Sequence, residues 1–238
     1  MFTKQELEEL LVKVGERVKK QIKIYMIGGC ALSFKGLKTR TKDIDIIVTS
    51  QEGFDVLDAA MKESGLKSMT DKESEFYLTA LAVYKKEESR IDVFLKQVGK
   101  MLSLTKSMKQ RSEKYHTFGA LEVYLVSNED IFLFKMMTSR EGDLLDCDKI
   151  MQGEVDYDII YKEIVEQSKE EGRRWFFWVY ENICKLEEHN GIRIPIKNKL
   201  FALVEKYWEE RPNNFMSEIL DKGRHIPKRK LLKELSTS

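Results

Sequence analysis

The chain has 238 residues, of which 42% are hydrophobic and 34% charged, and its formal net charge is +1. This composition is typical of a folded globular protein and excludes an intrinsically disordered chain. The net charge provides no overall field to gather nucleic acid, although a local basic patch is compatible with it. No stretch approaches the roughly 18 apolar residues of a membrane span, and the N-terminus begins an amphipathic helix instead of a signal peptide. We therefore expect a cytoplasmic protein with no membrane partner.

The first predicted element is an amphipathic helix over about residues 3–20, where leucine and valine recur at helical spacing. The next stretch, 24–48, carries the strongest pattern in the chain. It begins as an apolar run of strand length, breaks at Gly28 and Gly29, resumes with helix-forming residues, and ends in a second apolar run that starts at Asp43. The stretch predicts a strand, a turn, a helix and a second strand.

The glycine pair and the aspartates of this stretch each have a chemical use. Two adjacent glycines between a strand and a helix let the backbone come close to a ligand, and the helix N-terminus offers unpaired N–H groups to an anion such as phosphate. Because side chains alternate along a strand, Asp43 and Asp45 point to one face while the neighbouring isoleucines point into the core. Two carboxylates on one face form a hard-oxygen site suited to Mg²⁺ or Mn²⁺.

A third carboxylate follows on a later strand. The sequence predicts a helix over 54–64, a strand over 75–84, a charged turn at 85–89 and a second strand over 90–95, so that the last two strands form a hairpin. Asp92 is the single inward acid of the second strand. It is therefore available to complete a set of three carboxylates.

The rest of the chain becomes increasingly helical. Residues 96–114 form a basic segment to which the pattern assigns no structure, and 115–126 predicts one or two short strands. From Ser127 the spacing of apolar residues becomes helical, and Ser127 is placed to cap the first of these helices. Further helices are predicted over 157–169, 173–188, 197–210 and 215–220.

The order of these motifs resembles the DNA polymerase β-like nucleotidyltransferase superfamily. Its pattern is a glycine pair, a spacer of roughly a dozen residues, an Asp-x-Asp strand and a third carboxylate on a later strand. The residues of this chain that match it are Gly28, Gly29, Asp43, Asp45 and Asp92, with 13 residues between the second glycine and the first aspartate. The resemblance covers about residues 20–150. It implies that a nucleoside monophosphate is transferred from a nucleoside triphosphate to a hydroxyl, with release of pyrophosphate.

The resemblance also implies roles for these residues. We expect Asp43 and Asp45 to hold one divalent ion on the triphosphate, and to share a second ion with Asp92 near the attacking hydroxyl. Asp92 has a second available role, as the acceptor of the hydroxyl proton. Gly28 and Gly29 would let the phosphates approach the start of the helix.

Two basic segments of the chain each have two possible interpretations. Lys38, Arg40 and Lys42 precede the carboxylate strand, where they either neutralise the triphosphate or solvate a loop. The basic tail at 222–230 either contacts RNA or is a solvated end.

The run from Lys135 to Asp146 is similar to a pattern of Lys, Arg and paired Asp that follows the catalytic strands in several prokaryotic branches of the superfamily. These branches include antitoxin- and toxin-type nucleotidyltransferases. By this resemblance Lys135 approaches the nucleotide phosphates, and Asp143 or Asp146 holds the adjoining helix. The alternative is pairing of charged side chains at i and i+4 on a helix surface.

The predicted fold class is α+β. A nucleotidyltransferase-type mixed sheet flanked by helices would occupy residues 1–155, and an all-helical C-terminal domain residues 156–238. We expect the helical half to supply the acceptor site, because the signature residues account only for the nucleotide and the metal. The acceptor hydroxyl can belong to a tRNA end, a protein or a small molecule. A non-catalytic, antitoxin-like nucleotide-binding partner of another protein, or an RNA-binding module on the same fold, stays open, but intact carboxylates favour the enzyme.

Overall fold

The computed structural model of the protein describes residues 1–69, 80–86, 89–99, 101–138, 140–170 and 172–210. The strands of this part of the chain are β1 (Phe2–Thr3), β2 (Ile22–Ile27), β3 (Arg40–Thr41), β4 (Asp43–Val48), β5 (Lys67–Ser68), β6 (Ala82–Lys86), β7 (Ser89–Leu95), β8 (Gln97–Val98), β9 (Leu102–Ser103), β10 (Glu113–Phe118) and β11 (Leu121–Leu125). Its helices are α1 (Lys4–Gly15), α2 (Gly28–Phe34), α3 (Gln51–Glu63), α5 (Lys106–Arg111), α6 (Asn128–Met136), α7 (Glu141–Met151), α8 (Tyr157–Glu170), α9 (Trp175–Asn190) and α10 (Lys197–Glu209).

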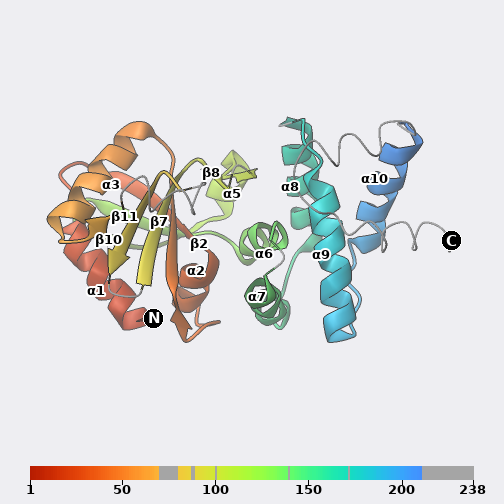
Figure 1. Cartoon of the computed structure of the whole chain (residues 1–238), viewed down its shortest axis with the longest axis horizontal. Coiled ribbons are helices and arrows are strands. Elements are labelled where there is room, and N and C mark those ends of the chain that lie inside the picture. Colours follow the sequence, from red (N-terminus) through yellow and green to blue (C-terminus); the bar gives the residue numbers. More distant parts are fainter. Residues whose placement is uncertain (70–79, 87–88, 100, 139, 171, 211–238) are drawn as a thin grey trace.

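Seven of the described strands form one mixed sheet, in the order β10-β11-β2-β4-β7-β6-β5. β2 pairs antiparallel with β4, and β4 pairs parallel with β7. The sheet lies at one end of the molecule with α1 and α3, and α6 and α7 lie between it and the group of α8, α9 and α10 (Figure 1). This arrangement confirms the expected α+β class, with a mixed sheet flanked by helices and a helical C-terminal region.

The face of the sheet under α1 and α3 is apolar. Ile44 and Ile46 of β4 and Ile91 of β7 are at most 2% exposed, and they pack against leucines of α1 and Met61 of α3. Because side chains alternate along a strand, the aspartates of the same two strands emerge on the opposite face. The sheet therefore separates this hydrophobic packing from the carboxylates.

The first helix begins where the sequence predicts and ends earlier. Thr3 and Glu6 form a capping box, in which the Thr3 N–H donates to the Glu6 carboxylate at 2.7 Å and the Thr3 hydroxyl oxygen accepts from the Glu6 N–H. The predicted end at residue 20 is wrong, because α1 ends at Gly15. At that point the backbone runs against the β10–β11 turn, and a Cβ at Gly15 would lie 2.3 Å from the Phe118 carbonyl oxygen.

Two other segments differ from the sequence pattern. α3 begins at Gln51, earlier than the predicted start at 54, because the Ser50 hydroxyl oxygen accepts a hydrogen bond from the Gly53 N–H and caps the helix. The unassigned segment 96–114 contains the β8–β9 hairpin and α5. Of these, β8 contacts β7, the strand that carries Asp92.

The predicted hairpin around the third carboxylate is confirmed, since β6 and β7 pair antiparallel. β6 begins at Ala82 and runs through Lys86, which pairs with Ser89. Residues 75–79 of the predicted strand, the helix predicted over 215–220 and the basic tail at 222–230 lie outside the described residues.

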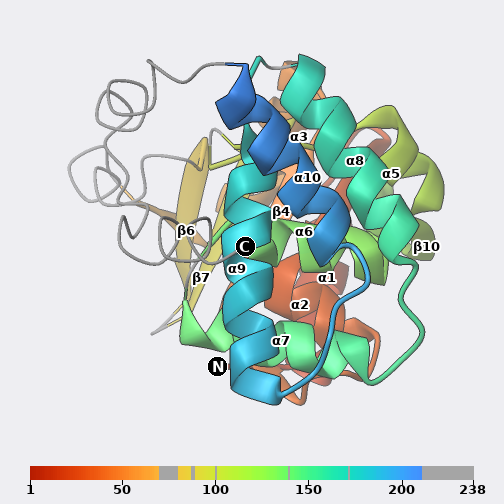
Figure 2. The same cartoon turned by 90° about the vertical axis from the view of Figure 1, so that its right-hand side faces the viewer.

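The helical half packs directly on the sheet half. α9 contacts both α8 and α10, and Figure 2 shows these three helices in front of the rest of the molecule. α6 packs against α8 and α9. The buried hydrophobic residues form one cluster that runs from Phe2 to Tyr207. The division into domains 1–155 and 156–238 stays a prediction. No helix in the described part of the chain has the length and apolar character that crossing a bilayer requires.

A buried charged cluster joins α5, α6 and α8. Arg111 at the end of α5 donates to Asp130 of α6 at 2.7 Å and to Glu163 of α8 at 2.6 Å. Glu163 also accepts a hydrogen bond from the Thr105 hydroxyl at 2.7 Å. Asp130 and Glu163 are 1% and 2% exposed. Buried carboxylates are costly without a partner, so the two acids depend on Arg111.

Arg111→Met should therefore destabilise the protein by about 3–5 kcal/mol, because it leaves Asp130 and Glu163 buried without their shared cation. Urea unfolding at neutral pH measures the loss. Lys62→Met is the matched control, since Lys62 pairs with Asp58 on an exposed helix surface at 2.7 Å and its removal should change stability by less than about 1 kcal/mol. Equal effects of the two substitutions would contradict the assignment of the Arg111 cluster.

Candidate active site

The three carboxylates predicted from the sequence lie together on neighbouring strands. Asp43 and Asp45 are on β4, and Asp92 is on β7, where it is paired directly beside Asp45. α2 starts at Gly28, immediately after β2. β2 pairs with β4 on the edge of β4 opposite to β7. Strand pairing therefore brings the glycine turn and both carboxylate strands to one place.

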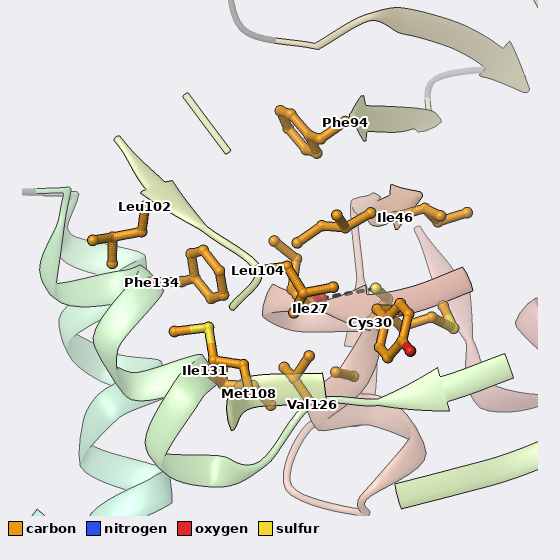
Figure 3. Packing of buried hydrophobic residues seen from close by; sticks show 14 of the residues in the cluster. Ile27, Cys30, Ile46, Phe94, Leu102, Leu104, Met108, Val126, Ile131 and Phe134 are labelled. Atoms are coloured by element: carbon orange, nitrogen blue, oxygen red, sulfur yellow. Dashed lines mark hydrogen bonds between the residues drawn. The ribbon is translucent and has the colours of Figure 1, made fainter. Parts of the chain in front are cut away.

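A cavity of about 560 Å³ lies beside these carboxylates. Its described charged residues are Asp45, Asp92, Asp143, Arg90, Lys135 and Arg140. Its described apolar residues are Ile27, Ala80, Phe94, Val98, Met101, Leu102, Phe134 and Met137. Figure 3 shows four of the apolar side chains, which come from four different elements: Ile27 of β2, Phe94 of β7, Leu102 of β9 and Phe134 of α6. The cavity thus joins a charged part to an apolar part.

The helical half contributes none of the described lining residues, all of which lie between Ile27 and Asp143. The layer order explains this, since α6 and α7 stand between the sheet and the group of α8, α9 and α10 (Figure 1). The expectation that the helical half supplies the acceptor site stays a prediction.

The glycine pair is required by close approach. Gly28 has a φ of 61°, which favours glycine, and a Cβ on it would lie 2.7 Å from Oδ2 of Asp45. A Cβ on Gly29 would lie 2.7 Å from Oγ1 of Thr41. Gly28 lines the cavity, and Gly29 packs behind it against β3. The pair therefore brings the start of α2 against the Asp45 carboxylate.

Arg90 is a candidate functional residue that the sequence reasoning missed. Its Nε atom lies 3.0 Å from Oδ2 of Asp92 and 3.4 Å from Oδ1 of Asp43. One positive charge thus lies between carboxylates of two neighbouring strands. The signal was present in the sequence, because Arg90 and Asp92 are two residues apart on one strand and so share a face.

The carboxylate oxygens fit a divalent cation. Oδ1 of Asp43 and Oδ1 of Asp92 are buried and accept no hydrogen bond from the described residues. A buried carboxylate oxygen without a hydrogen bond is costly, and hard oxygen donors are what Mg²⁺ and Mn²⁺ prefer. Within the described residues, no three Asp, Glu, His or Cys side chains already converge as a metal site. The chemistry of the donors suits the ion, although the three carboxylates are not drawn together as a metal site in this structure, where Arg90 contacts Asp43 and Asp92.

Burial and mutual repulsion raise the pKa of two of these acids. Burial, together with the nearby charges of Asp92 and Asp43, raises the pKa of Asp45 to about 7. Burial raises the pKa of Asp92 to about 6, although the neighbouring Arg90 acts in the opposite direction. Closely spaced carboxylates resist full ionisation, and a bound cation would lower the repulsion between them.

Lys135 lies in a buried network of ion pairs. Its Nζ is 2.9 Å from Asp143 and 2.7 Å from Asp146, and the three side chains are at most 8% exposed. Lys38 also binds Asp146, at 2.8 Å, and Arg140 binds Asp143 at 2.7 Å. The alternative of i to i+4 surface pairing is therefore wrong for Lys135. Lys135 lines the cavity, where a phosphate could reach it. Contact of Lys135 with phosphates stays a prediction.

The other predicted basic residues lie elsewhere. Arg40 on β3 and Lys42 just after it are both exposed. Neither is among the described residues that line the cavity. Their contact with a triphosphate stays a prediction.

The raised pKa values give the metal-free protein a pH dependence with a definite sign. The folded state holds the protons of Asp45 and Asp92 more tightly than the unfolded chain, whose carboxyls ionise near 3.8. Their contribution to stability is therefore present below about pH 4 and is lost as pH rises to about 7. One pKa unit corresponds to about 1.4 kcal/mol, and 1 kcal/mol to about 2–4 °C in Tm. Asp45→Asn should therefore melt several degrees above the wild type at about pH 8 in EDTA.

Thermal melts of both proteins at about pH 5 and pH 8 check this expectation. The advantage of Asp45→Asn should be largest at the higher pH, where the wild-type carboxylate is ionised. A Tm difference that is the same at both pH values would contradict the raised pKa of Asp45.

Solved structures that match this chain share little sequence with it. ANT(2″)-Ia in complex with adenylyl-2″-tobramycin is 11% identical, with a TM-score of 0.48 over 70% of this chain and 97% of that chain. A nucleotidyltransferase-like protein from Paracoccidioides brasiliensis is 18% identical, with a TM-score of 0.39 over 63% and 78%. JHP933 from Helicobacter pylori is 12% identical, with a TM-score of 0.39 over 90% and 97%. No protein of curated function matches the sequence.

A family match covers most of the chain. Residues 4–185 match the family described as nucleotidyltransferase of unknown function (DUF6036). The matched region contains the glycine pair, the three carboxylates of β4 and β7, and the buried network around Lys135. It covers well over half of the 238 residues. The chain belongs to this DUF6036 nucleotidyltransferase family.

Proposed function

We propose that the protein is a metal-dependent enzyme that transfers a nucleoside monophosphate from a nucleoside triphosphate to a hydroxyl acceptor and releases pyrophosphate. The observation that supports this most is the pairing of Asp45 beside Asp92 on parallel strands. Two buried carboxylate oxygens that accept no hydrogen bond from the described residues, on Asp43 and Asp92, lie in the same group, and Gly28 brings α2 against it.

Asp43, Asp45 and Asp92 are the residues that would hold Mg²⁺ or Mn²⁺. Bound there, such an ion would offset the negative charge of the triphosphate and of the leaving pyrophosphate. Arg90 now compensates part of the carboxylate charge, at 3.0 Å from Asp92 and 3.4 Å from Asp43. The guanidinium and the ion would therefore compete for the same oxygens.

The remaining groups of the cavity have roles that follow from their chemistry. Gly28 would let the phosphates approach the start of α2, and the charges of Lys135 and Arg140 would favour an anion at that side. Asp92 would also be placed to accept the proton of the attacking hydroxyl, since it lies beside Asp45 in the cavity lining. The positive charges of Arg40 and Lys42, which are both exposed, would attract the triphosphate from outside the cavity.

The acceptor is a tRNA end, a protein hydroxyl or a small-molecule hydroxyl. The apolar part of the cavity, which includes Phe94, Leu102 and Phe134, suits the nucleobase or an apolar portion of the acceptor. We place the reaction in the cytoplasm, with the triphosphate as the first partner. Mass spectrometry of a cell lysate incubated with labelled triphosphate would identify the modified acceptor.

The competing function is nucleotide binding without turnover, as in an antitoxin-like partner protein, or RNA binding on the same fold. The complete set of Asp43, Asp45 and Asp92 favours the enzyme, because neither alternative needs three clustered carboxylates. Calorimetry and pyrophosphate release distinguish the functions. Metal-dependent binding of a triphosphate with no release in the presence of lysate would favour the non-catalytic protein.

Asp45→Asn should lower metal-dependent pyrophosphate release about a thousandfold or more. A neutral amide cannot balance a divalent ion, and losing such a ligand removes several kcal/mol of transition-state stabilisation. The assay supplies each of the four labelled triphosphates with Mg²⁺ or Mn²⁺ and a lysate as the acceptor source.

Asp55→Asn is the matched control for this assay. Asp55 lies on α3, where its carboxylate accepts a hydrogen bond from Gln51 at 2.8 Å on an exposed surface. This variant should keep wild-type activity. Full activity of Asp45→Asn would rule out the proposed metal-binding role.

A further inference from the structure

The first part of the helical half belongs to the family region, yet no described residue of this half lines the cavity. The family match runs to residue 185 and so includes α8 and most of α9. Two buried carboxamides on these helices, Gln167 and Asn182, reach segments that do line the cavity. They are 1% and 2% exposed.

Asn182 of α9 holds the end of α6. Its Nδ2 donates to the carbonyl oxygens of Met136 and Thr138, both at 2.7 Å. Carbonyls at the C-terminal end of a helix have no partner within the helix, so this side chain supplies one from outside. Met137, Thr138 and Arg140 line the cavity at this point and are called the helix wall.

The helix wall is connected to the buried charges beside the carboxylates. The Thr138 hydroxyl donates to the Asp143 carboxylate, and Arg140 donates to it at 2.7 Å. Asp143 in turn accepts from Lys135 at 2.9 Å. A shift of the α6 end would therefore displace the cations that face the proposed phosphate site.

Gln167 of α8 holds the β8–β9 hairpin. Its Oε1 accepts from the N–H of Ser103 at 2.9 Å, and its Nε2 donates to the carbonyl oxygen of Ser103 at 3.2 Å. The side chain thus pairs with both backbone groups of one residue, as a neighbouring strand would. Val98, Met101 and Leu102 of this hairpin line the cavity and are called the hairpin wall.

We propose that Asn182 and Gln167 are positioning residues, through which α8 and α9 fix the two walls of the cavity and so set the rate of transfer. The inference rests on the proposed function. Groups around reacting atoms must be held closely, and a displacement of about 1 Å can lower a rate about a hundredfold. A side-chain amide that makes two hydrogen bonds to one backbone segment restrains the position of that segment.

The test uses variants that keep side-chain volume and lose the hydrogen bonds, Asn182→Leu and Gln167→Met. Val179→Ala is the matched control, because Val179 is a fully buried α9 residue whose truncation removes packing and no hydrogen bond. Melting temperatures, kcat, KM for the triphosphate and amide hydrogen exchange are measured on the full chain, well below the lowest Tm.

Positioning residues should show a particular split between the kinetic constants. We expect kcat to fall about ten- to a hundredfold in Asn182→Leu and Gln167→Met. KM for the triphosphate should stay within about threefold in Gln167→Met, because the hairpin wall carries no charge, and should rise in Asn182→Leu, because the helix wall is joined to the cations that face the proposed phosphate site. Val179→Ala should lose Tm but keep its kcat. If Asn182→Leu keeps the kcat of Val179→Ala, Asn182 is a stability residue only and the inference is overturned.

Hydrogen exchange decides the structural part of the inference without any activity. Asn182→Leu should speed exchange of the N–H groups at 138, 143 and 144, which are hydrogen-bonded in the wild type, and leave Leu104 protected. Gln167→Met should do the reverse. If wild-type protein releases no pyrophosphate, the proposed function fails, whereas unchanged exchange in both variants overturns the positioning role itself.

Discussion

Repulsion between closely spaced carboxylates is the constraint on which the rest of the structure depends. Asp45 and Asp92 lie side by side on parallel strands, and Asp43 lies on the same face. Without a cation, burial of these groups raises the pKa of Asp45 to about 7 and that of Asp92 to about 6. A fold that keeps such a cluster must hold it rigidly, because the charges themselves favour separation.

The sheet provides that rigidity from its other face. The isoleucines that alternate with the aspartates are almost fully buried under α1 and α3, so β4 and β7 cannot slip by one residue without exposing them and burying the acids. Basic side chains then lie around the carboxylate face of the sheet, one in direct contact with the carboxylates and two farther away. Arg90 contacts the carboxylates directly, while the buried Lys135 and the exposed Arg140 reach the cavity from a separate network around Asp143. The same side chains that lower the cost of the cluster would meet a triphosphate.

The sequence predicted those parts of the site that local periodicity encodes. Gly28, the Asp43–Asp45 pair and Asp92 could be found because a turn and an alternating strand are patterns of neighbouring residues. Arg90 was encoded in the same way, two residues before Asp92, and was missed. Helix ends were less accurate, since α1 ends where Gly15 meets the β10–β11 turn, a contact between segments far apart in the chain.

Long-range contacts are also why the sequence could not show how the helical half meets the rest of the chain. Its stripes of apolar residues predicted helices correctly but said nothing about Gln167 and Asn182, whose partners are backbone groups of distant segments. The same holds for Glu163, which shares Arg111 with Asp130 across three helices. A chain that ended at residue 155 would keep every proposed metal ligand and yet lose all three of these side chains. Arg111 would lose one of its two carboxylates. The end of α6 and the β8–β9 hairpin would lose the side chains that hydrogen-bond them. The proposed metal ligands and the side chains that hold the cavity walls are thus divided between the two halves of the sequence, although one hydrophobic core joins them.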